Sequence, residues 1–344
     1  MQNARFSAFA IALSVSVSIA GCSGSPSVNQ EAVVEGAGAP GSSGSGGVGG
    51  AESPLGNGGS FAQAGGVMLD VQADEEMAGS TGFAGATSEP YPDTLPDGFT
   101  AANVFGGYRV GDEISAETGT AGETLDGSSN GCGTTILAVI RDFKRDDLNF
   151  EGPNIGLEKD IVSPTLGADR KPVFAHSAPT QSVKDPVQFA DWYRTVDGLN
   201  KAYRLELWFG PNAGISSFQS TEFFPLDGKG WNDMDEKYGH NFFFTTEIHT
   251  QFKYEGGETF KFTGDDDVWV FINEKLAIDL GGVHPALEAS IDIDARASEL
   301  GLEKGKVYAF DMFQTERHTF QSNFRADTTL NFVDCGTIVP EIPK

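Results

Sequence analysis

The sequence predicts an all-β fold, an antiparallel β-sandwich with one short helix that is preceded by a disordered tether. Residues 242–254 alternate between a mainly apolar face and a mainly polar face, which is the period of a β-strand with one face on a core. Further short runs of strand character follow, separated by turns that contain Gly or Asn. Only residues 186–196 show the spacing of an amphipathic helix. Many short strands with little helix favour two packed antiparallel sheets.

The 344-residue chain divides by composition into three parts. Residues 1–21 have the pattern of a secretory leader, in which Arg5 precedes an apolar run that is too short to span a membrane. Residues 22–130 are rich in Gly, Ser and acidic residues and hold few large apolar ones, so they predict a disordered tether. Within it, residues 96–117 carry Phe99, Phe105 and Tyr108, and the alternative there is a loosely ordered extension that lies on the domain. Residues 131–344 carry nearly all of the strand patterns and form the predicted β-sandwich domain.

The leader ends in Ile19-Ala20-Gly21-Cys22, which resembles the lipobox of bacterial lipoproteins. The cysteine of such a motif is acylated after cleavage, so we expect a mature chain that starts at a lipidated Cys22. By analogy with lipoprotein sorting, Ser23 implies the outer membrane, at the cell surface or the periplasmic face. The alternative is ordinary cleavage that leaves Cys22 as a free thiol.

The chain is strongly acidic, with a formal net charge of −26. Such a surface repels nucleic acid and anionic lipid headgroups, so we expect no nucleic-acid partner and membrane contact only through the lipid anchor. It favours divalent cations and neutral partners. The alternative is that the acidic residues serve solubility alone.

Local patterns place each element within the predicted domain. The apolar run TTILAVI at residues 134–140 is rich in β-branched residues and predicts a buried strand. Asp185 and Pro186 are typical of a helix start, because Asp caps the first turn and proline fits it. The helix should pack on the core through Phe189, Trp192, Tyr193 and Val196. We expect the remaining strands at residues 203–209, 242–254, 258–262, 267–272, 276–280, 291–293, 307–313 and 328–333.

Three consecutive carboxylates, Asp265, Asp266 and Asp267, stand directly before the apolar run 268–272. Burying an uncompensated carboxylate costs several kcal/mol, so a folded turn needs water, backbone N–H groups or a cation to take up the charge. Oxygen ligands of this kind suit Ca²⁺, and Asn273 could supply a further oxygen. The alternative is a solvated acidic turn without a metal.

Six blocks in one order resemble the fibro-slime domain family, a branch of the protective-antigen-type (PA14-like) β-sandwich domains. They include GDDDVWVFINEKLAIDLGGVH at residues 264–284 and ERHTFQSNF at residues 316–324, and together they cover residues 133–333. In the lectin members of that superfamily, two consecutive aspartates joined by a cis peptide hold Ca²⁺, and the metal binds sugar hydroxyls. The resemblance therefore implies that Asp265 and Asp266 bind both Ca²⁺ and carbohydrate.

This chain departs from the family pattern at two positions. Asp267 stands where a small residue is usual, and Glu274 stands where the Asn-Gly turn of the family has glycine. A tight hairpin turn of this kind requires positive φ at both central residues, which Glu tolerates poorly. We also expect Trp231, in a polar loop beside Asp233 and Asp235, to be a stacking platform for a sugar; the alternative is a loop anchor.

Cys132 and Cys335 flank the predicted domain. If Cys22 is lipidated, these two cysteines would be exported to an oxidising compartment, where a disulfide between them is expected. Two free buried thiols are the alternative.

The sequence thus predicts a cell-surface lipoprotein that binds extracellular polysaccharide or the glycan of a glycoprotein, with the help of Ca²⁺. One alternative is a structural matrix component that assembles with itself and binds no sugar. Another is a glycosidase, which would need two carboxylates about 5–10 Å apart across a cleft. No motif supports that arrangement, so we expect that the protein is not an enzyme.

Overall fold

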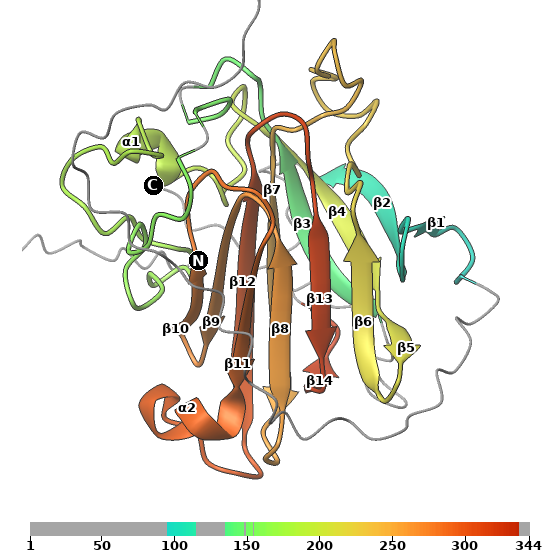
Figure 1. Ribbon diagram of the computed structural model, residues 1–344, viewed down its shortest axis with the longest axis vertical. Coiled ribbons are helices and arrows are strands. Elements are labelled where there is room, and N and C mark those ends of the chain that lie inside the picture. Colours follow the sequence, from blue (N-terminus) through green and yellow to red (C-terminus); the bar gives the residue numbers. More distant parts are fainter. Residues whose placement is uncertain (1–94, 115–134, 148, 154, 337–344) are drawn as a thin grey trace, which may run out of the picture. The chain divides into compact units, whose positions relative to one another are not determined.

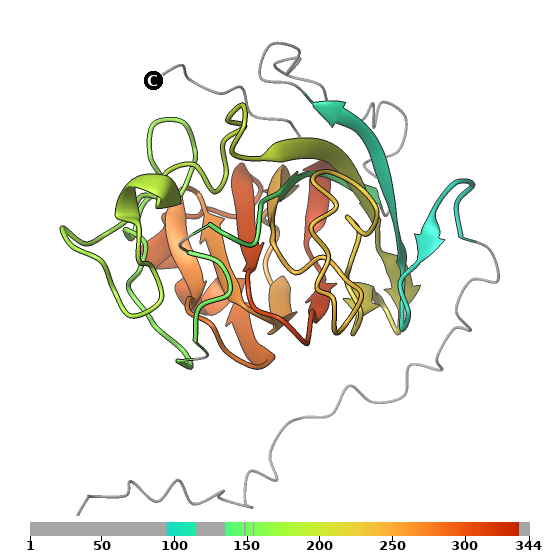
Figure 2. The ribbon, with the colours of Figure 1, turned by 90° about the horizontal axis from the view of Figure 1, so that it is seen from above.

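The computed structural model describes residues 95–114, 135–147, 149–153 and 155–336, and within them the predicted all-β fold is confirmed. Fourteen strands form two antiparallel sheets that lie face to face (Figures 1 and 2). The larger sheet has the order β1-β2-β4-β3-β7-β12-β9-β10, with β14 paired to β7, and the smaller sheet has the order β11-β8-β13-β6-β5.

The strands are short, as the alternating patterns predict. The larger sheet consists of β1 (Thr100–Ala101), β2 (Gly107–Ile114), β3 (Thr135–Asp142), β4 (Lys201–Trp208), β7 (Phe244–Lys253), β9 (Asp267–Ile272), β10 (Lys275–Leu280), β12 (Val307–Glu316) and β14 (Asn331–Asp334). The smaller sheet consists of β5 (Gly210–Asn212), β6 (Ile215–Ser220), β8 (Thr259–Gly264), β11 (Leu287–Asp292) and β13 (Phe324–Thr328).

The folded domain begins earlier than the predicted boundary at residue 131. β2 lies inside the predicted tether of residues 22–130, yet it pairs with β4 along its length. Tyr108 and Val110 on β2 pack against the core, and the Tyr108 ring lies 5.8 Å from that of Phe223. Residues 95–114 therefore belong to the domain and not to the tether, as the alternative of an extension on the domain has it, because these few apolar side chains reach an existing sheet edge.

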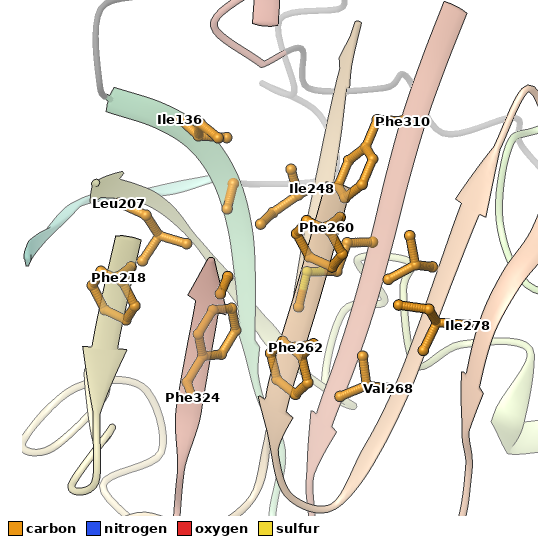
Figure 3. Packing of buried hydrophobic residues seen from close by; sticks show 14 of the residues in the cluster. Ile136, Leu207, Phe218, Ile248, Phe260, Phe262, Val268, Ile278, Phe310 and Phe324 are labelled. Carbon is orange, nitrogen blue, oxygen red and sulfur yellow. The ribbon is translucent and has the colours of Figure 1, made fainter. Parts of the chain in front are cut away.

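The main core fills the space between the two sheets (Figure 3). Alternate residues of each strand point inward, as Phe260 and Phe262 do on β8. Full burial of each such side chain contributes about 1.5–3 kcal/mol relative to exposure. The facing positions of the larger sheet include Ile136, Leu207, Ile248 and Phe310.

Two helices are present in the described part of the chain, where the sequence predicted one. α1 spans only Pro186–Phe189, with Asp185 accepting hydrogen bonds from Val187 N and Gln188 N as its cap. The predicted helix to residue 196 is therefore too long, although Trp192 and Tyr193 are buried as expected.

The second helix, α2 (Ile293–Leu300), follows β11 directly, where the sequence analysis expected a strand through residue 293. Asp292 caps its first turn, and Gly301 ends it with φ of 74°.

The polar face of β7 is also buried, against charged side chains from the neighbouring strands β3 and β12 and from Lys171 in the β3–β4 connection. Glu247 is bonded to Arg141 (2.6 Å) and Lys171, and His249 lies 2.5 Å from Asp311. Burial alone would raise the pKa of Glu247, but Lys171 and Arg141 hold that pKa well below its usual range. Complementary charge thus lets this face enter the interior.

Five connections between strands meet at one end of the sandwich, the upper end in Figure 1. The register shows this, because Gly264 at the end of β8 pairs with the first residues of both β11 and β13, Leu287 and Phe324. The last residue of β12, Glu316, likewise pairs with the first residue of β7, Phe244. The connections that meet there are residues 143–200, 221–243, 265–266, 281–286 and 317–323.

In the described residues no helix has the length and apolar character needed to cross a membrane.

Candidate functional site

A small pocket of about 20 Å³ lies at this end, where the connections meet. A cavity of this volume has room for about one water molecule, so the pocket suits a single small group or an ion. Two consecutive carboxylates and two histidines lie in its wall together with an aromatic ring. The lining residues are Asp265, Asp266, His284, Pro285, His318, Thr319, Phe320 and Gln321.

The acidic turn carries the chain from one sheet to the other. Gly264 ends β8 in the smaller sheet, and Asp267 begins β9 in the larger one. A Cβ atom at Gly264 would lie 2.3 Å from the carbonyl oxygen of Asn323, so glycine is required at this close approach. The Asp265–Asp266 peptide is cis, as the family resemblance implied.

Asp265 is held by a single residue on the β12–β13 connection. Its Oδ1 accepts from Asn323 N and its Oδ2 from Asn323 Nδ2, both at 2.6 Å. Only 2% of Asp265 is exposed, and this burial raises the pKa of its carboxyl although the Asn323 hydrogen bonds oppose the shift. Each oxygen accepts one hydrogen bond and keeps a second lone pair for another partner.

Asp266 is held by backbone groups on the β10–β11 and β12–β13 connections. Its Oδ1 accepts from His284 N (3.3 Å) and its Oδ2 from Arg317 N (3.1 Å). Burial raises the pKa of this carboxyl well above its usual range, and the charges of Asp267 and Asp265 add to the shift, although Arg317 opposes it.

Glu316, the last residue of β12, is a third carboxyl beside this pair. It is fully buried, and its Oε2 accepts no hydrogen bond. The nearby Ser322 hydroxyl donates instead to the carbonyl of Phe223 (2.8 Å). Burial raises the pKa of Glu316 well above its usual range, and the charges of Asp266 and Asp265 reinforce the shift. The fold therefore disfavours ionisation of these carboxyls unless a positive charge lies beside them.

Asp267 was predicted as a metal ligand, but in the structure its carboxylate is paired with Arg317. Arg317 Nε donates to its Oδ2 at 2.6 Å, Arg317 Nη2 to its Oδ1 at 3.1 Å, and Gly282 N to its Oδ1 at 2.6 Å. Both Asp267 and Arg317 are fully buried. The guanidinium thus takes the place that a cation would have had, and Asp267 does not line the pocket.

Asn273 was also predicted as a ligand, and the fold does not bring it to the aspartates. It follows β9, six residues after Asp267, which is about 20 Å along a strand. Its Nδ2 donates to the carbonyl of Leu300 at 2.8 Å. Asn273 therefore belongs to the opposite end of the sandwich.

Trp231 is not among the pocket residues. The ammonium groups of Lys144 and Lys201 lie 4.2 and 4.6 Å from the centre of its ring, and its backbone N donates to Asp142 Oδ2 at 2.5 Å. These contacts match the alternative role of a loop anchor, because two lysines already occupy positions over the ring.

The sequence analysis missed Glu316, Arg317 and Asn323, although all three lie in the block ERHTFQSNF. The sequence does show that Glu316 and Arg317 stand directly before a polar loop. That pattern does not reveal which carboxyl group Arg317 will bind.

A preformed metal cage is absent from the described residues, because no three side chains of His, Cys, Asp or Glu there are arranged to enclose an ion. Asp265 and Asp266 offer a hard, oxygen-only donor set at the pocket wall, with Glu316 Oε2 unpartnered beside them. Ca²⁺ takes six to eight oxygens, so backbone carbonyls, waters or a ligand would have to complete its shell.

The predicted lipidation and disulfide fall largely outside the part of the chain that the structure describes. Cys22 and Cys132 both lie outside it. Cys335 is buried, with 5% exposed. Both modifications remain predictions.

Residues 197–344 match the family model of the PA14 domain. The matched span contains the acidic turn and the β12–β13 connection, and the match supports a role in binding at the surface of the molecule. The narrower fibro-slime resemblance stays a prediction.

Among curated proteins, this chain is similar to three proteins of Dictyostelium discoideum. Protein psiR is 36% identical over 194 residues, psiD 40% over 200 and psiC 37% over 200. These matches cover 52%, 54% and 53% of this chain. They cover 19%, 39% and 38% of the relatives, so the chain spans well under half of the length of those proteins.

Among solved structures, the PA14 domain of the MpAFP antifreeze protein is similar to 64% of this chain, over 98% of its own length, at 11% identity and a TM-score of 0.27. The β-glucosidase from Kluyveromyces marxianus in complex with glucose is similar to 64% of this chain, over 19% of its own length, at 13% identity and a TM-score of 0.24. Similarity this weak carries no argument about function.

Proposed function

We propose that this protein is a surface-binding protein of fibro-slime type whose sandwich domain binds extracellular carbohydrate through a Ca²⁺ ion. The observation that carries this proposal is the cluster of buried carboxyl groups at the pocket. Asp265 and Asp266 line the pocket, and Glu316 lies beside them with an oxygen that accepts no hydrogen bond.

A divalent cation is the simplest partner for this charge. Mutual repulsion of the three carboxylates would destabilise the folded turn, and a cation held by Asp265 and Asp266, with Glu316 beside it, would reverse that effect. An ion bound to the folded state alone, at about 100 times its dissociation constant, adds about 2.7 kcal/mol of stability. Because Ca²⁺ accepts more oxygens than these carboxylates offer, it would keep positions open for hydroxyl groups of a sugar.

Thermal unfolding tests the cation. EDTA should lower the melting temperature, and Ca²⁺ should restore it, whereas NaCl at equal ionic strength should not. Salt screens repulsion between exposed charges but hardly affects an ion in direct contact with buried ligands. Calorimetry that detects no Ca²⁺ binding up to millimolar concentrations would rule out this mechanism.

A glycan array probed with and without Ca²⁺ tests the ligand. Binding that requires Ca²⁺ and is lost in Asp265→Asn and Asp266→Asn supports a lectin. Retained folding with no glycan binding would favour a structural matrix component that assembles with itself. We propose no catalytic activity, and turnover of a polysaccharide by the purified domain would contradict this.

The proposal also includes export and lipid anchoring at Cys22, on the basis of the leader and lipobox pattern. Wild-type protein should partition into detergent, and Cys22→Ala should remain soluble or unprocessed. An unmodified amino terminus in a wholly aqueous wild-type protein would contradict the anchor.

A further inference from the structure

Two aromatic rings stand exposed beside the acidic pocket. Phe320 is 55% exposed and lines the pocket, and Tyr238 is 37% exposed. Their ring centres are 6.3 Å apart, at an interplanar angle of 35°. The other large apolar side chains with comparable exposure in the described ranges are all aliphatic, namely Val104, Leu157, Val173, Val187, Val307 and Val333. Within the described residues, the most exposed aromatic side chains therefore lie together beside the acidic pocket.

The backbone holds Phe320 in this position against its own preference. Its φ is 118°, a region that a bulky residue rarely adopts. Neighbours on both sides fix the loop: Thr319 donates to Glu151 through its N (3.2 Å) and its Oγ1 (2.7 Å), and Asn323 donates to Asp265. Such outliers persist where the surroundings impose them, and they cluster at ligand-binding sites.

Tyr238 is also anchored from below. Its backbone N donates to Asp235 Oδ1 at 2.9 Å, and its ring meets Phe242 edge-on at 6.0 Å. Lys237 Nζ lies 4.5 Å from the ring centre and donates to the hydroxyl at 2.7 Å, so one face of Tyr238 is occupied and Phe320 is the more open ring of the two. Because both rings are fixed before a ligand arrives, stacking on them costs little additional ordering.

From this geometry we infer that Phe320 and Tyr238 form an aromatic platform for the C–H face of a neutral pyranose. The inference rests on the proposed carbohydrate function and names its ligand class. Aromatic surface gains free energy by covering apolar C–H groups, while the hydroxyl edge of the same ring faces the carboxylate side of the pocket.

The charge of the site disfavours acidic sugars as ligands. A divalent cation brings two positive charges, whereas Asp265, Asp266 and Glu316 together bring three negative ones when ionised. Arg317 does not change this difference, because it is paired with Asp267, and Lys237 changes it little, because its ammonium is exposed to solvent and already bonded to the Tyr238 hydroxyl. A uronate or sialate would therefore meet residual negative charge inside a strongly acidic protein, so neutral pyranosides are favoured.

The test uses the full protein and calorimetry with two probe sets: neutral methyl pyranosides of glucose, galactose and mannose, and the corresponding uronates. Phe320→Gly removes the ring and suits the positive φ, so its melting temperature should equal or exceed that of wild type. Its Ca²⁺ affinity should stay within about twofold, and its pyranoside affinity should fall about tenfold, the magnitude of one aromatic contact. Tyr238→Ala, which changes no strained backbone, should lower pyranoside affinity in the same way.

Val307→Ala is the matched control, because Val307 is 46% exposed at the opposite end of β12. It should change neither affinity. Normal Ca²⁺ binding together with unchanged pyranoside binding in both platform variants would overturn the inference, as would uronate binding equal to that of neutral sugars. A wild-type protein that binds no Ca²⁺ would overturn the proposed function itself, and the platform with it.

Discussion

Arg317 and Asp267 form a two-bond ion pair in the interior, with Arg317 Nε 2.6 Å from Asp267 Oδ2 and both side chains fully buried. The same guanidinium donates to the carbonyls of Asn149 (3.1 Å) and Ser182 (2.5 Å). One arginine thus ties the acidic turn to two distant parts of the 143–200 connection. It also leaves Asp265 and Asp266 without a full counter-charge of their own.

Asp267→Asn should be the most destabilising of the three aspartate substitutions. Breaking a buried pair leaves the remaining charge uncompensated, which costs about 3–5 kcal/mol in free energy of unfolding. Urea denaturation measures this loss. Glu299→Gln, which removes an exposed partner of Arg296, is the control and should change stability little. A small loss of stability with complete loss of Ca²⁺ binding would instead make Asp267 a ligand.

Glu316→Gln should stabilise the protein in EDTA. The ionised carboxylate is buried beside two others, and its raised pKa means that the fold disfavours the charged form. A neutral amide of similar shape removes that repulsion, with a gain on the order of 1 kcal/mol. The same substitution should weaken Ca²⁺ binding in calorimetry. Glu288→Gln, a substitution of an exposed glutamate, is the control. A destabilised Glu316→Gln variant with normal Ca²⁺ affinity would contradict the role of Glu316 as a carboxyl that repels Asp265 and Asp266 and favours a bound cation.

The sequence predicted what depends on local pattern. Alternation located the long strand β7, and the Asp-Asp-Asp run located the turn that lines the pocket. It could not predict which carboxyl Arg317 would choose, because 50 residues separate Asp267 from Arg317. The distance between Asp267 and Asn273 was misjudged for a related reason, since a strand between them places neighbours in sequence at opposite ends of a sheet.

The burial of the polar face of β7 is the second feature that the local sequence does not predict. Glu247 and His249 carry the polar half of a clean alternation, which normally indicates solvent. Partners from three separate segments, Arg141, Lys171 and Asp311, make burial possible, and local sequence does not show these partners.

Asp142 predicts a pH dependence of stability. Burial raises the pKa of its carboxyl to about 6, although hydrogen bonds from Trp231 N and Asn241 oppose the shift. The folded state then binds the proton more tightly than the unfolded state, so this contribution is full at low pH and is lost as pH rises through about 6.

The destabilisation caused by Asp142→Asn should therefore shrink between pH 4.5 and 7.5, by on the order of 2 kcal/mol. Urea titrations of both proteins in EDTA at the two pH values measure the change. An equal difference at both values would show that Asp142 keeps an ordinary pKa.

Glu274→Gly should stabilise the β9–β10 hairpin. Asn273 and Glu274 have φ of 51° and 64°, so the predicted turn with two left-handed residues is confirmed. Glycine adopts this conformation without strain, and we expect a gain of about 0.5–1 kcal/mol in urea denaturation. Asn273→Gly is the contrast, because it loses the bond to Leu300 O and should bring no gain. A lower melting temperature for Glu274→Gly would contradict the strain argument.

The disulfide between Cys132 and Cys335 is the last prediction. Cys335 O accepts a hydrogen bond from Leu137 N at 2.7 Å, so Cys335 lies beside the first residues of β3. Cys132 precedes Leu137 by five residues, which span at most about 17 Å, and the chain can therefore fold back to the Cα separation of about 5.5–6 Å that a disulfide needs. The bridge would close a loop of about 200 residues and restrict the unfolded chain, which the entropy model values at about 4–5 kcal/mol. Cys132→Ser should accordingly lower the melting temperature of oxidised protein and leave that of reduced protein unchanged, and peptide mapping without reductant should find the linked peptides. Two free thiols in exported protein would refute the bridge.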